Sequence, residues 1–207
     1  MAEKYNTVAN EATSEFVEKK SRFISHVKPV TTEEEAVAFI EQIKKQYWDA
    51  RHNVYAYIIG KNSELQRYSD DGEPQGTGGI PMLEVLRGEA VTDVVAVVTR
   101  YFGGTLLGTG GLVRAYTRGA KDGLEAAGII TMSLYNEISI KVDYTASGKV
   151  QYEIMQKGHR LKDTVYGADV EFIVLAEKAK SQGFIKEIIN ATSGRAVITE
   201  GEEYWLA

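Results

Sequence analysis

The residues best suited to chemistry in this chain lie in a glycine-rich turn between an apolar run and a basic segment. Val94–Val98 predicts a buried strand that ends at Arg100 and Tyr101, and a helix is predicted to open at Leu112. The turn between them carries Gly103, Gly104, Gly108, Gly110 and Gly111. Glycines let backbone N–H groups approach a ligand, and a helix N-terminus adds its own free N–H groups. With Arg100 and Arg114 as bidentate donors, the turn predicts a site for an anion or a nucleic acid.

A second interpretation of the turn is structural, because glycines also allow a helix to pack closely against a strand. Nucleotide-binding motifs do not decide between the two. Gly103 and Gly108 have the spacing of a Walker loop, but Thr109 and Gly110 follow where that loop needs Lys and Ser or Thr. The dinucleotide pattern GxGxxG is also absent. The two arginines favour anion binding.

A second unusual stretch, residues 69–81, combines glycines and prolines with the acids Asp70, Asp71 and Glu73. Such acids can hold Mg²⁺ or act in acid–base chemistry, yet in loops of this kind they more commonly form turns or cap helices. The chain has no EF-hand spacing, and its histidines lack zinc-site spacing. We therefore assign no metal site and no catalytic residue, and we single out His52 as the histidine placed to join the acidic loop.

The elements that must position these residues follow from periodicity and capping signals. Thr31 or Thr32 opens a helix by a capping box with Glu34 or Glu35, and Thr77 is predicted to cap the helix after the acidic loop. Residues 1–10 are predicted to be loose. Strands are predicted at Glu11–Lys19, Arg22–Val30, Asn53–Gly60 and Leu65–Ser69, and helices over residues 31–47, Ile80–Leu86 and Leu112–Ala127.

The last third of the chain predicts a separate unit. Its order is strand, helix, two strands, helix, strand, which is the ferredoxin-like βαββαβ arrangement. The strands are predicted at Tyr135–Asp143, Leu161–Tyr166, Val170–Ala176 and Ala196–Trp205, and the helices at Ser147–Lys157 and Lys178–Asn190. We place the domain division between residues 131 and 132, which gives an α+β protein with domains 1–131 and 132–207.

Composition limits the classes of function. The 207 residues carry a net charge of -5 and no cysteine, which excludes disulfides and cysteine-based metal sites or nucleophiles. No secretory signal and no apolar run long enough for a membrane is present, so we expect a cytoplasmic protein without a membrane partner. Both predicted domains are mildly acidic, so any contact with nucleic acid has to rest on a local basic patch.

The two unusual stretches together resemble the signature of the IMPACT/YigZ family, in its bacterial two-domain form. The first part of the resemblance is Tyr68–Pro74, with Gly76 and Thr77 after it. The second part is Arg100–Gly104, followed by Leu106, Leu107, Gly110, Gly111, Leu112, Arg114, Ala115 and Tyr116. Both parts occur in order, and the likeness covers residues 13–128, while the C-terminal unit is similar to the accessory domain of bacterial members.

This resemblance implies an N-terminal fold like a ribosomal-protein and elongation-factor domain, with a left-handed βαβ crossover, and a second domain like the C-terminal domain of elongation factor G. It implies a translation-associated regulatory or binding protein that engages RNA, the ribosome or a translation factor. The alternatives are a hydrolase or phosphoryl-handling enzyme that uses the acidic loop and glycine turn, and a pure protein-interaction module. We assign no cofactor, no reaction and no oligomeric state.

Overall fold

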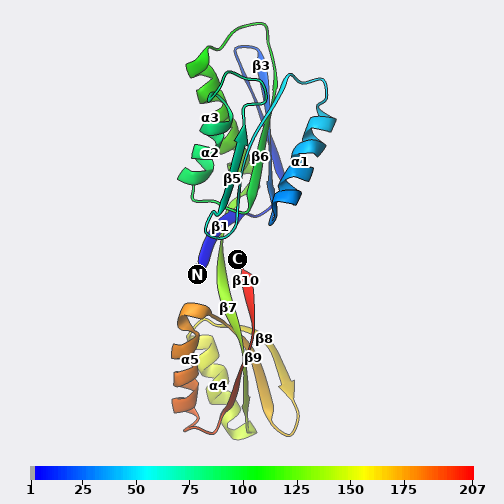
Figure 1. Cartoon of the computed structure of the whole chain (residues 1–207). Coiled ribbons are helices and arrows are strands. Elements are labelled where there is room, and N and C mark those ends of the chain that lie inside the picture. The colour runs from blue at the N-terminus through cyan, green and yellow to red at the C-terminus, as the bar shows by residue number, and fades with distance from the viewer. Residues whose placement is uncertain (1–2) are drawn as a thin grey trace. The chain divides into compact units, whose positions relative to one another are not determined.

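The computed structural model describes residues 3–207 as two domains, each with its own sheet and helices (Figure 1). Contacts group Lys4–Thr131 into an N-terminal domain and Met132–Ala207 into a C-terminal domain. The strands of the N-terminal domain are β1 (Lys4–Val8), β2 (Ala12–Glu18), β3 (Ser21–Pro29), β4 (His52–Ile59), β5 (Leu65–Ser69) and β6 (Val94–Tyr101). Its helices are α1 (Glu33–Gln46), α2 (Gly79–Gly88) and α3 (Thr109–Ala127).

The main sheet of the N-terminal domain has the strand order β2-β3-β6-β4-β5, with every neighbouring pair antiparallel. Its centre is β6, whose residues Val94–Val98 are fully buried, as a β-branched strand covered on both faces should be. Strands β3 and β4 therefore run parallel on either side of β6 and are joined through α1. Strands β5 and β6 run parallel on either side of β4 and are joined through α2.

Helices cover both faces of this sheet. Val95 and Val97 pack with the apolar side of α1, whereas Val94, Ala96 and Val98 pack with α2 and α3. The crossover from β3 to β4 and the crossover from β5 to β6 run in opposite directions across the sheet, and the strands that they join also point in opposite directions. These two reversals cancel, so the hand of each crossover depends on which face its helix covers. Because α1 and α2 lie on opposite faces, the two βαβ crossovers have opposite hands. One of them is left-handed, against the usual right-handed rule, and the left-handed crossover implied by the family resemblance is confirmed.

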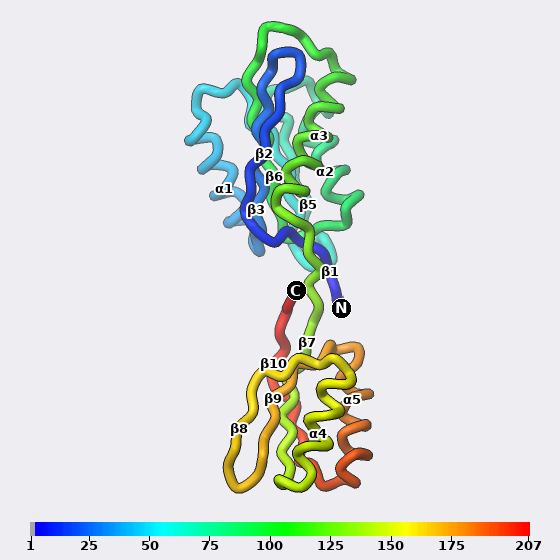
Figure 2. The backbone as a smooth tube through the Cα atoms, turned by 180° about the vertical axis from the view of Figure 1, so that it is seen from behind, coloured from blue at the N-terminus to red at the C-terminus, as the bar shows by residue number. Residues whose placement is uncertain are grey.

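The C-terminal domain has the ferredoxin-like order predicted from the sequence (Figure 2). Its elements are β7 (Ile129–Val142), α4 (Tyr144–Gln156), β8 (Arg160–Tyr166), β9 (Val170–Glu177), α5 (Lys178–Ala191) and β10 (Val197–Leu206). Strand β7 pairs with β1, β9 and β10 in a five-stranded sheet, and β9 pairs in turn with β8; the pairs β7–β9, β7–β10 and β8–β9 are antiparallel. The core is formed between this sheet and the helices by residues such as Ile138, Val174, Val150 and Phe184.

Two local predictions about the N-terminal domain were wrong. Residues 1–10 were expected to be loose, but Lys4–Val8 forms β1, because distant segments pair with it; Met1 and Ala2 lie outside the described residues. The N–H of Thr92 donates to the carbonyl of Asn6 at 2.9 Å, and Thr131 Oγ1 donates to Asn6 Oδ1 at 2.8 Å. No short-range pattern in the sequence predicts that residues as distant as Thr92 and Thr131 hydrogen-bond to Asn6.

The other error concerns the starts of two helices. Helix α3 begins at Thr109 rather than Leu112, because Gly108 takes a φ of 73° and its carbonyl accepts from the N–H of Leu112 at 2.9 Å. Helix α2 follows Gly78 and has no side-chain cap from Thr77, whose Oγ1 instead donates to the carbonyl of Pro74 at 2.6 Å.

Candidate functional site

The residues predicted to do chemistry gather at one end of the main sheet. Strand register places Arg22 opposite Tyr101 and His52 opposite Arg100. The start of β3, the end of β6 and the start of β4 therefore meet at this end of the domain. The β2–β3 turn, the acidic loop and the glycine turn all leave the sheet there, and we call this region the loop end of the N-terminal domain.

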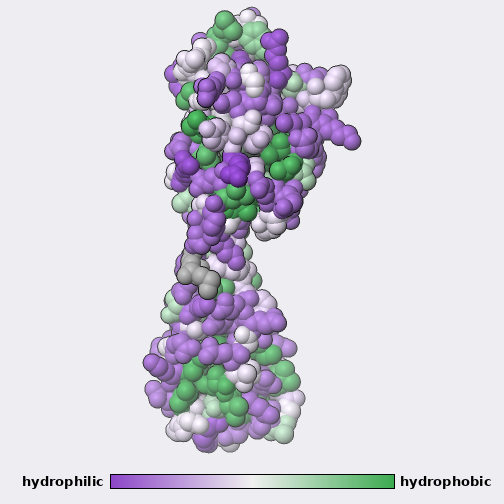
Figure 3. Space-filling model, in the orientation of Figure 1, coloured by the Kyte–Doolittle hydropathy of each residue, from purple (hydrophilic) through white to green (hydrophobic). Residues whose placement is uncertain are grey.

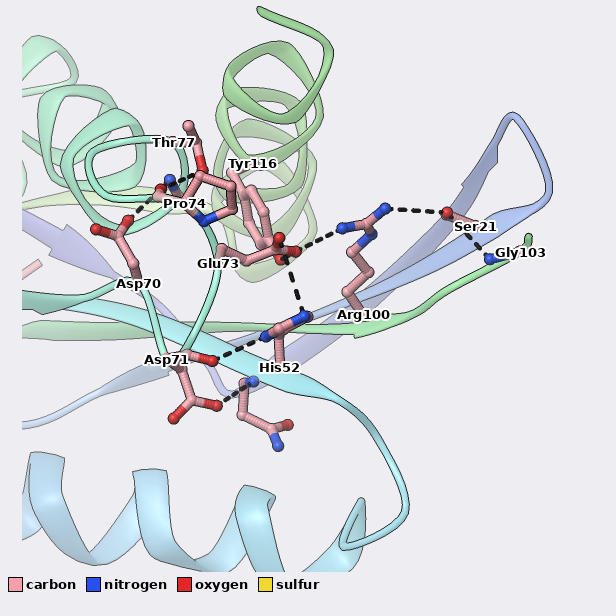
Figure 4. A network of polar contacts seen from close by, with 12 residues as sticks. Ser21, His52, Asp70, Asp71, Glu73, Pro74, Thr77, Arg100, Gly103 and Tyr116 are labelled. Atoms are coloured by element: carbon pink, nitrogen blue, oxygen red, sulfur yellow. Dashed lines mark hydrogen bonds and ion pairs between the residues drawn. The ribbon is translucent and has the colours of Figure 1, made fainter. Parts of the chain in front are cut away.

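Glu73 of the acidic loop is the centre of a buried polar network (Figure 4). Its side chain is only 3% exposed, and Oε1 accepts from Arg100 Nη1 and from the Tyr116 hydroxyl, each at 2.7 Å. Burial raises the pKa of Tyr116, and the adjacent carboxylate of Glu73 raises it further. Tyr116 therefore stays a neutral donor at physiological pH. The network ties the acidic loop, β6 and α3 together.

Arg100 is held inside the domain. The residue is 6% exposed, and its guanidinium lies between the rings of Phe23 and Phe102, 5.6 Å from each centroid. Nη2 donates to Ser21 Oγ at 3.4 Å, while Nε is buried without a hydrogen-bond partner among the described residues. The charge of Arg100 is thus matched by Glu73, and the anion-binding role predicted for this arginine stays a prediction.

His52 lies beside Glu73 and Gly72 in the wall of a cleft. Its Nδ1 is 2.9 Å from the carbonyl oxygen of Asp71, and its Nε2 is 3.9 Å from Glu73 Oε2. A carbonyl oxygen only accepts, so Nδ1 carries a proton in either charge state of the ring. The histidine singled out from the sequence therefore does join the acidic loop.

The other two acids of this loop face elsewhere. Asp70 caps the start of α2: Oδ1 accepts from the N–H groups of Gly78 at 2.9 Å and Gly79 at 2.8 Å, and Oδ2 accepts from Gly76 at 2.8 Å. Asp71 Oδ2 accepts from the N–H of Asn53 at 2.6 Å. These contacts match the turn-forming and capping interpretation of the loop. In residues 3–207 no group of three or more His, Asp or Glu side chains is arranged to hold a metal ion.

An open cleft of about 640 Å³ lies between the acidic loop and the glycine turn. Arg51, His52 and Glu73 line one side of it, and Leu106, Gly108 and Thr109 line the other. The N-terminus of α3, which has no side-chain cap, therefore contributes to the cleft wall. Phe102 and Leu106 are 42% and 82% exposed, and Figure 3 shows apolar atoms at this tip of a largely hydrophilic surface.

The glycine turn has features of both interpretations that the sequence left open, close backbone packing and a ligand site. A Cβ on Gly103 would lie 2.0 Å from the backbone of Lys20, so this glycine is needed for close packing against the β2–β3 turn. Gly104 and Gly108 have φ values of 81° and 73°, which favour glycine. Gly108 also lines the cleft, whereas Gly111 lies with Arg114 on a neighbouring pocket of about 200 Å³.

Arg114 is exposed and lines the neighbouring pocket rather than the cleft. It shares its pocket with Lys19, Arg118 and the acid Glu18. Tyr101, also predicted as a site residue, donates its hydroxyl to Asp49 Oδ1 at 2.7 Å, and this bond raises the pKa of Tyr101 to about 12. The cleft thus brings together His52, Glu73 and Arg100, while Arg114 and Tyr101 lie outside it.

Sequence reasoning missed two members of the network, Ser21 and Tyr116. Ser21 is fully buried and accepts from the N–H of Gly103 at 3.2 Å in addition to its contact with Arg100. Tyr116 stands 43 positions after Glu73 and was named as part of the family signature, without a role in the site. A single hydroxyl on an otherwise apolar helix face was the one available signal, since a buried tyrosine usually finds a hydrogen-bond partner.

The chain is a two-domain α+β protein, and comparisons with known proteins place it within a family. Residues 19–124 match the Impact N-terminal domain, and residues 140–195 match a domain described only as one of unknown function. The chain belongs to the IMPACT family.

Relatives include the IMPACT family member YvyE of Bacillus subtilis, 44% identical over 206 residues that cover 100% of this chain and 95% of that protein. The IMPACT family member YigZ of Escherichia coli is 35% identical, covering 89% of this chain and 92% of its own. Protein IMPACT of Mus musculus is 36% identical over 44% of this chain and 30% of its own. A solved structure titled as that of a hypothetical protein has a TM-score of 0.63 and 33% identity, and covers 98% of this chain and 99% of that one.

Proposed function

We propose that this protein is a translation-associated binding protein that contacts RNA through the loop end of its N-terminal domain. One observation carries the proposal: four exposed cations of this region make no ion pair with any residue of 3–207. They are Lys19, Lys20, Arg51 and Arg114. Two exposed arginines nearby are already paired, Arg22 with Glu15 at 2.7 Å and Arg118 with Asp122 at 3.2 Å.

RNA is the ligand that best fits this arrangement. The chain as a whole is acidic, so unpaired cations concentrated at one end supply the local patch that phosphate contacts require. The exposed ring of Phe102 lies beside the patch and offers a surface on which a base can stack. The ribosomal-protein and elongation-factor folds that the family resemblance implies support a place in translation, by analogy of fold.

Within this proposal the glycine turn supplies backbone donors rather than side-chain charge. Gly108 and Thr109 present the uncapped N-terminus of α3 to the cleft, where a phosphate is favoured. Arg114 adds a free guanidinium one turn further along the helix. Arg100 has a different task, because its ion pair with Glu73 fixes the position of the carboxylate in the cleft wall.

A phosphoryl-handling enzyme is the second candidate, because His52, Glu73 and Arg100 do meet at one cleft. The acidic loop and glycine turn that such an enzyme would use also carry Asp70 and Arg114, but Asp70 accepts from the backbone at the start of α2 and Arg114 lines the neighbouring pocket. A thermal-shift screen with nucleotides, with and without Mg²⁺, separates the candidates: an enzyme of this kind gives a Mg²⁺-dependent shift at millimolar nucleotide, and a pure protein-interaction module gives neither this shift nor RNA binding.

The proposal is tested by co-sedimentation with ribosomes and by titration of a labelled single-stranded RNA. The double variant Lys19→Ala/Lys20→Ala is expected to bind RNA about tenfold more weakly, because two phosphate contacts are lost. The matched control Lys149→Ala/Lys186→Ala removes two exposed cations of the C-terminal domain and is expected to bind like the wild type. Equal loss in both variants, or no binding by the wild type, contradicts the proposal.

A further inference from the structure

Trp48 at the loop end is exposed to water over most of its surface. It lies between α1 and β4, in the segment that leads to the start of β4, and 82% of the residue is exposed. An indole in this position contributes little to the core of the domain. Tryptophan is, however, among the residue types that contribute most binding energy when they lie in an interface. Trp48 is therefore a candidate for contact with a ligand at the loop end.

The residues on either side of Trp48 are attached to the sheet. Tyr47 packs against the buried ring of His26, with 5.0 Å between the two centroids. On the other side, Asp49 Oδ1 accepts from the Tyr101 hydroxyl at 2.7 Å. Because both neighbours of Trp48 are held in this way, less free energy is lost to ordering the segment when a ligand lies on the indole.

The surroundings of Trp48 indicate what kind of ligand fits. Among residues 41–53 it is the one exposed large apolar side chain, so this segment forms no apolar patch around it. Lys45 and Arg51 stand three residues before and after it, both exposed and without an ion pair within residues 3–207. The one acid between these two cations, Asp49, is already hydrogen-bonded. A protein partner needs a larger apolar area around such a ring, whereas a nucleobase stacks on a single ring and brings phosphates for the cations beside it.

Trp48 is also close to the parts of the loop end that the proposed function assigns to RNA. Arg51 lines the cleft, and the chain from Trp48 to Arg51 spans at most about 10 Å. The bond between Asp49 and Tyr101 joins the same segment to the end of β6, directly before the exposed ring of Phe102. The indole, the cleft and the ring of Phe102 therefore lie within reach of one short RNA strand.

We propose that Trp48 stacks on an unpaired base of RNA bound at the loop end, a proposal that rests on the RNA-binding function above. The bases of a duplex are stacked on one another, whereas the bases of a single strand are free to stack on aromatic side chains. Phosphates are present in both forms. Trp48 therefore adds affinity for single strands that duplex RNA does not receive, while the cations of the loop end act on both.

Tryptophan fluorescence reports this contact directly, because the chain has only two tryptophans. The variant Trp205→Phe leaves Trp48 as the sole tryptophan, and an unlabelled ten-nucleotide oligouridylate is expected to quench its emission. Binding is measured in parallel by the anisotropy of the same RNA with a fluorescein label. RNA that binds without changing the emission of Trp48 overturns the stacking site and leaves RNA binding intact. Absence of binding overturns both proposals.

Substitutions then separate stacking from charge. Trp48→Ala is expected to bind the single-stranded RNA at least fivefold more weakly than the wild type, while Trp48→Phe keeps most of the affinity. Neither variant is expected to change the affinity for a blunt-ended duplex RNA or for inorganic polyphosphate, which carries charge but no base. The control Tyr152→Ala removes a ring that is 59% exposed in the C-terminal domain and is expected to bind like the wild type. If Trp48→Ala binds single strands as the wild type does, or loses polyphosphate to the same extent, Trp48 does not stack on a base and the proposal is wrong.

Discussion

At the scale of residues, the central feature is a carboxylate held by two donors inside the domain. Glu73 Oε1 accepts hydrogen bonds from both Arg100 and Tyr116, so the position of each donor limits where the other can lie. Buried ion pairs add little to stability compared with apolar packing, but a buried charge left without its partner is strongly destabilising. The network therefore acts chiefly to fix where Oε2 stands relative to His52.

Removing Arg100 tests whether the buried charge of Glu73 depends on its partner for stability. We expect Arg100→Ala to lower the free energy of unfolding by about 3–5 kcal/mol, because Glu73 would be left charged and buried. The exposed pair of Arg22 and Glu15 is the control, and Arg22→Ala should cost less than about 1 kcal/mol. Urea unfolding followed by tyrosine fluorescence measures both. A cost for Arg100→Ala as small as that for Arg22→Ala would contradict the account of the network.

A second residue-scale prediction concerns the buried His26. Burial lowers the pKa of His26 from 6.5 to about 4, and its Nε2 is buried without a partner in the described part of the chain. Between these pH values the unfolded chain binds a proton that the folded chain does not, so stability is full above pH 6.5 and falls as the pH drops toward 4.

We expect His26→Phe to remove part of this pH dependence, because the ring still packs near Tyr47 but no longer titrates. The urea midpoints of the wild type and the variant are measured at pH 7 and at pH 5. From pH 7 to pH 5, the midpoint of the wild type should fall further than that of the variant. A wild-type midpoint that falls no further than that of the variant would show that His26 does not titrate in this window.

At the scale of elements, the acidic loop has two roles: it caps the start of α2, and it forms one wall of the cleft. Asp70 accepts three backbone N–H groups of the segment that leads into the helix. Gly79 is needed at that point, because a Cβ there would lie 2.9 Å from the backbone of Ser69. The loop that presents Glu73 is therefore tied to the start of α2 by hydrogen bonds and close backbone packing.

This gives a prediction for Asp70. We expect Asp70→Ala to lower the free energy of unfolding by about 2 kcal/mol, the upper range for the loss of a helix cap. Asp122→Ala is the matched control, since that aspartate makes a surface pair with Arg118 and its loss should cost less than about 1 kcal/mol. Chemical denaturation of both variants provides the comparison, and equal costs would show that Asp70 does not hold the loop.

The elements also show what the sequence could and could not predict. The ferredoxin-like order and the left-handed crossover were predicted correctly, the first from periodicity and the second from family resemblance. The cap of α2 was assigned to Thr77, because capping signals are sought next to the helix, whereas Asp70 reaches it from eight residues before Gly78. The Glu73–Tyr116 bond joins residues 43 positions apart, and no local spacing rule describes such a pair.

At the scale of the whole molecule, charge distribution matters more than total charge. The chain carries a net charge of -5, yet Lys19, Lys20, Arg51 and Arg114 stand unpaired among the described residues at one end of one domain. The acidic remainder of the chain limits non-specific attraction to nucleic acid, and the proposed function therefore assigns RNA binding to this patch. No helix within residues 3–207 is long and apolar enough to cross a membrane.

The salt dependence of RNA binding tests the central claim most directly. If the four cations each meet a phosphate, a plot of log K against log salt concentration for a single-stranded RNA should have a slope of about -3. The variant Lys19→Ala/Lys20→Ala should reduce the magnitude of that slope by about 1.4, while Lys149→Ala/Lys186→Ala should leave it unchanged. A slope near zero, or the same slope in the wild type and the Lys19→Ala/Lys20→Ala variant, would contradict the assignment of RNA binding to the loop end of the N-terminal domain.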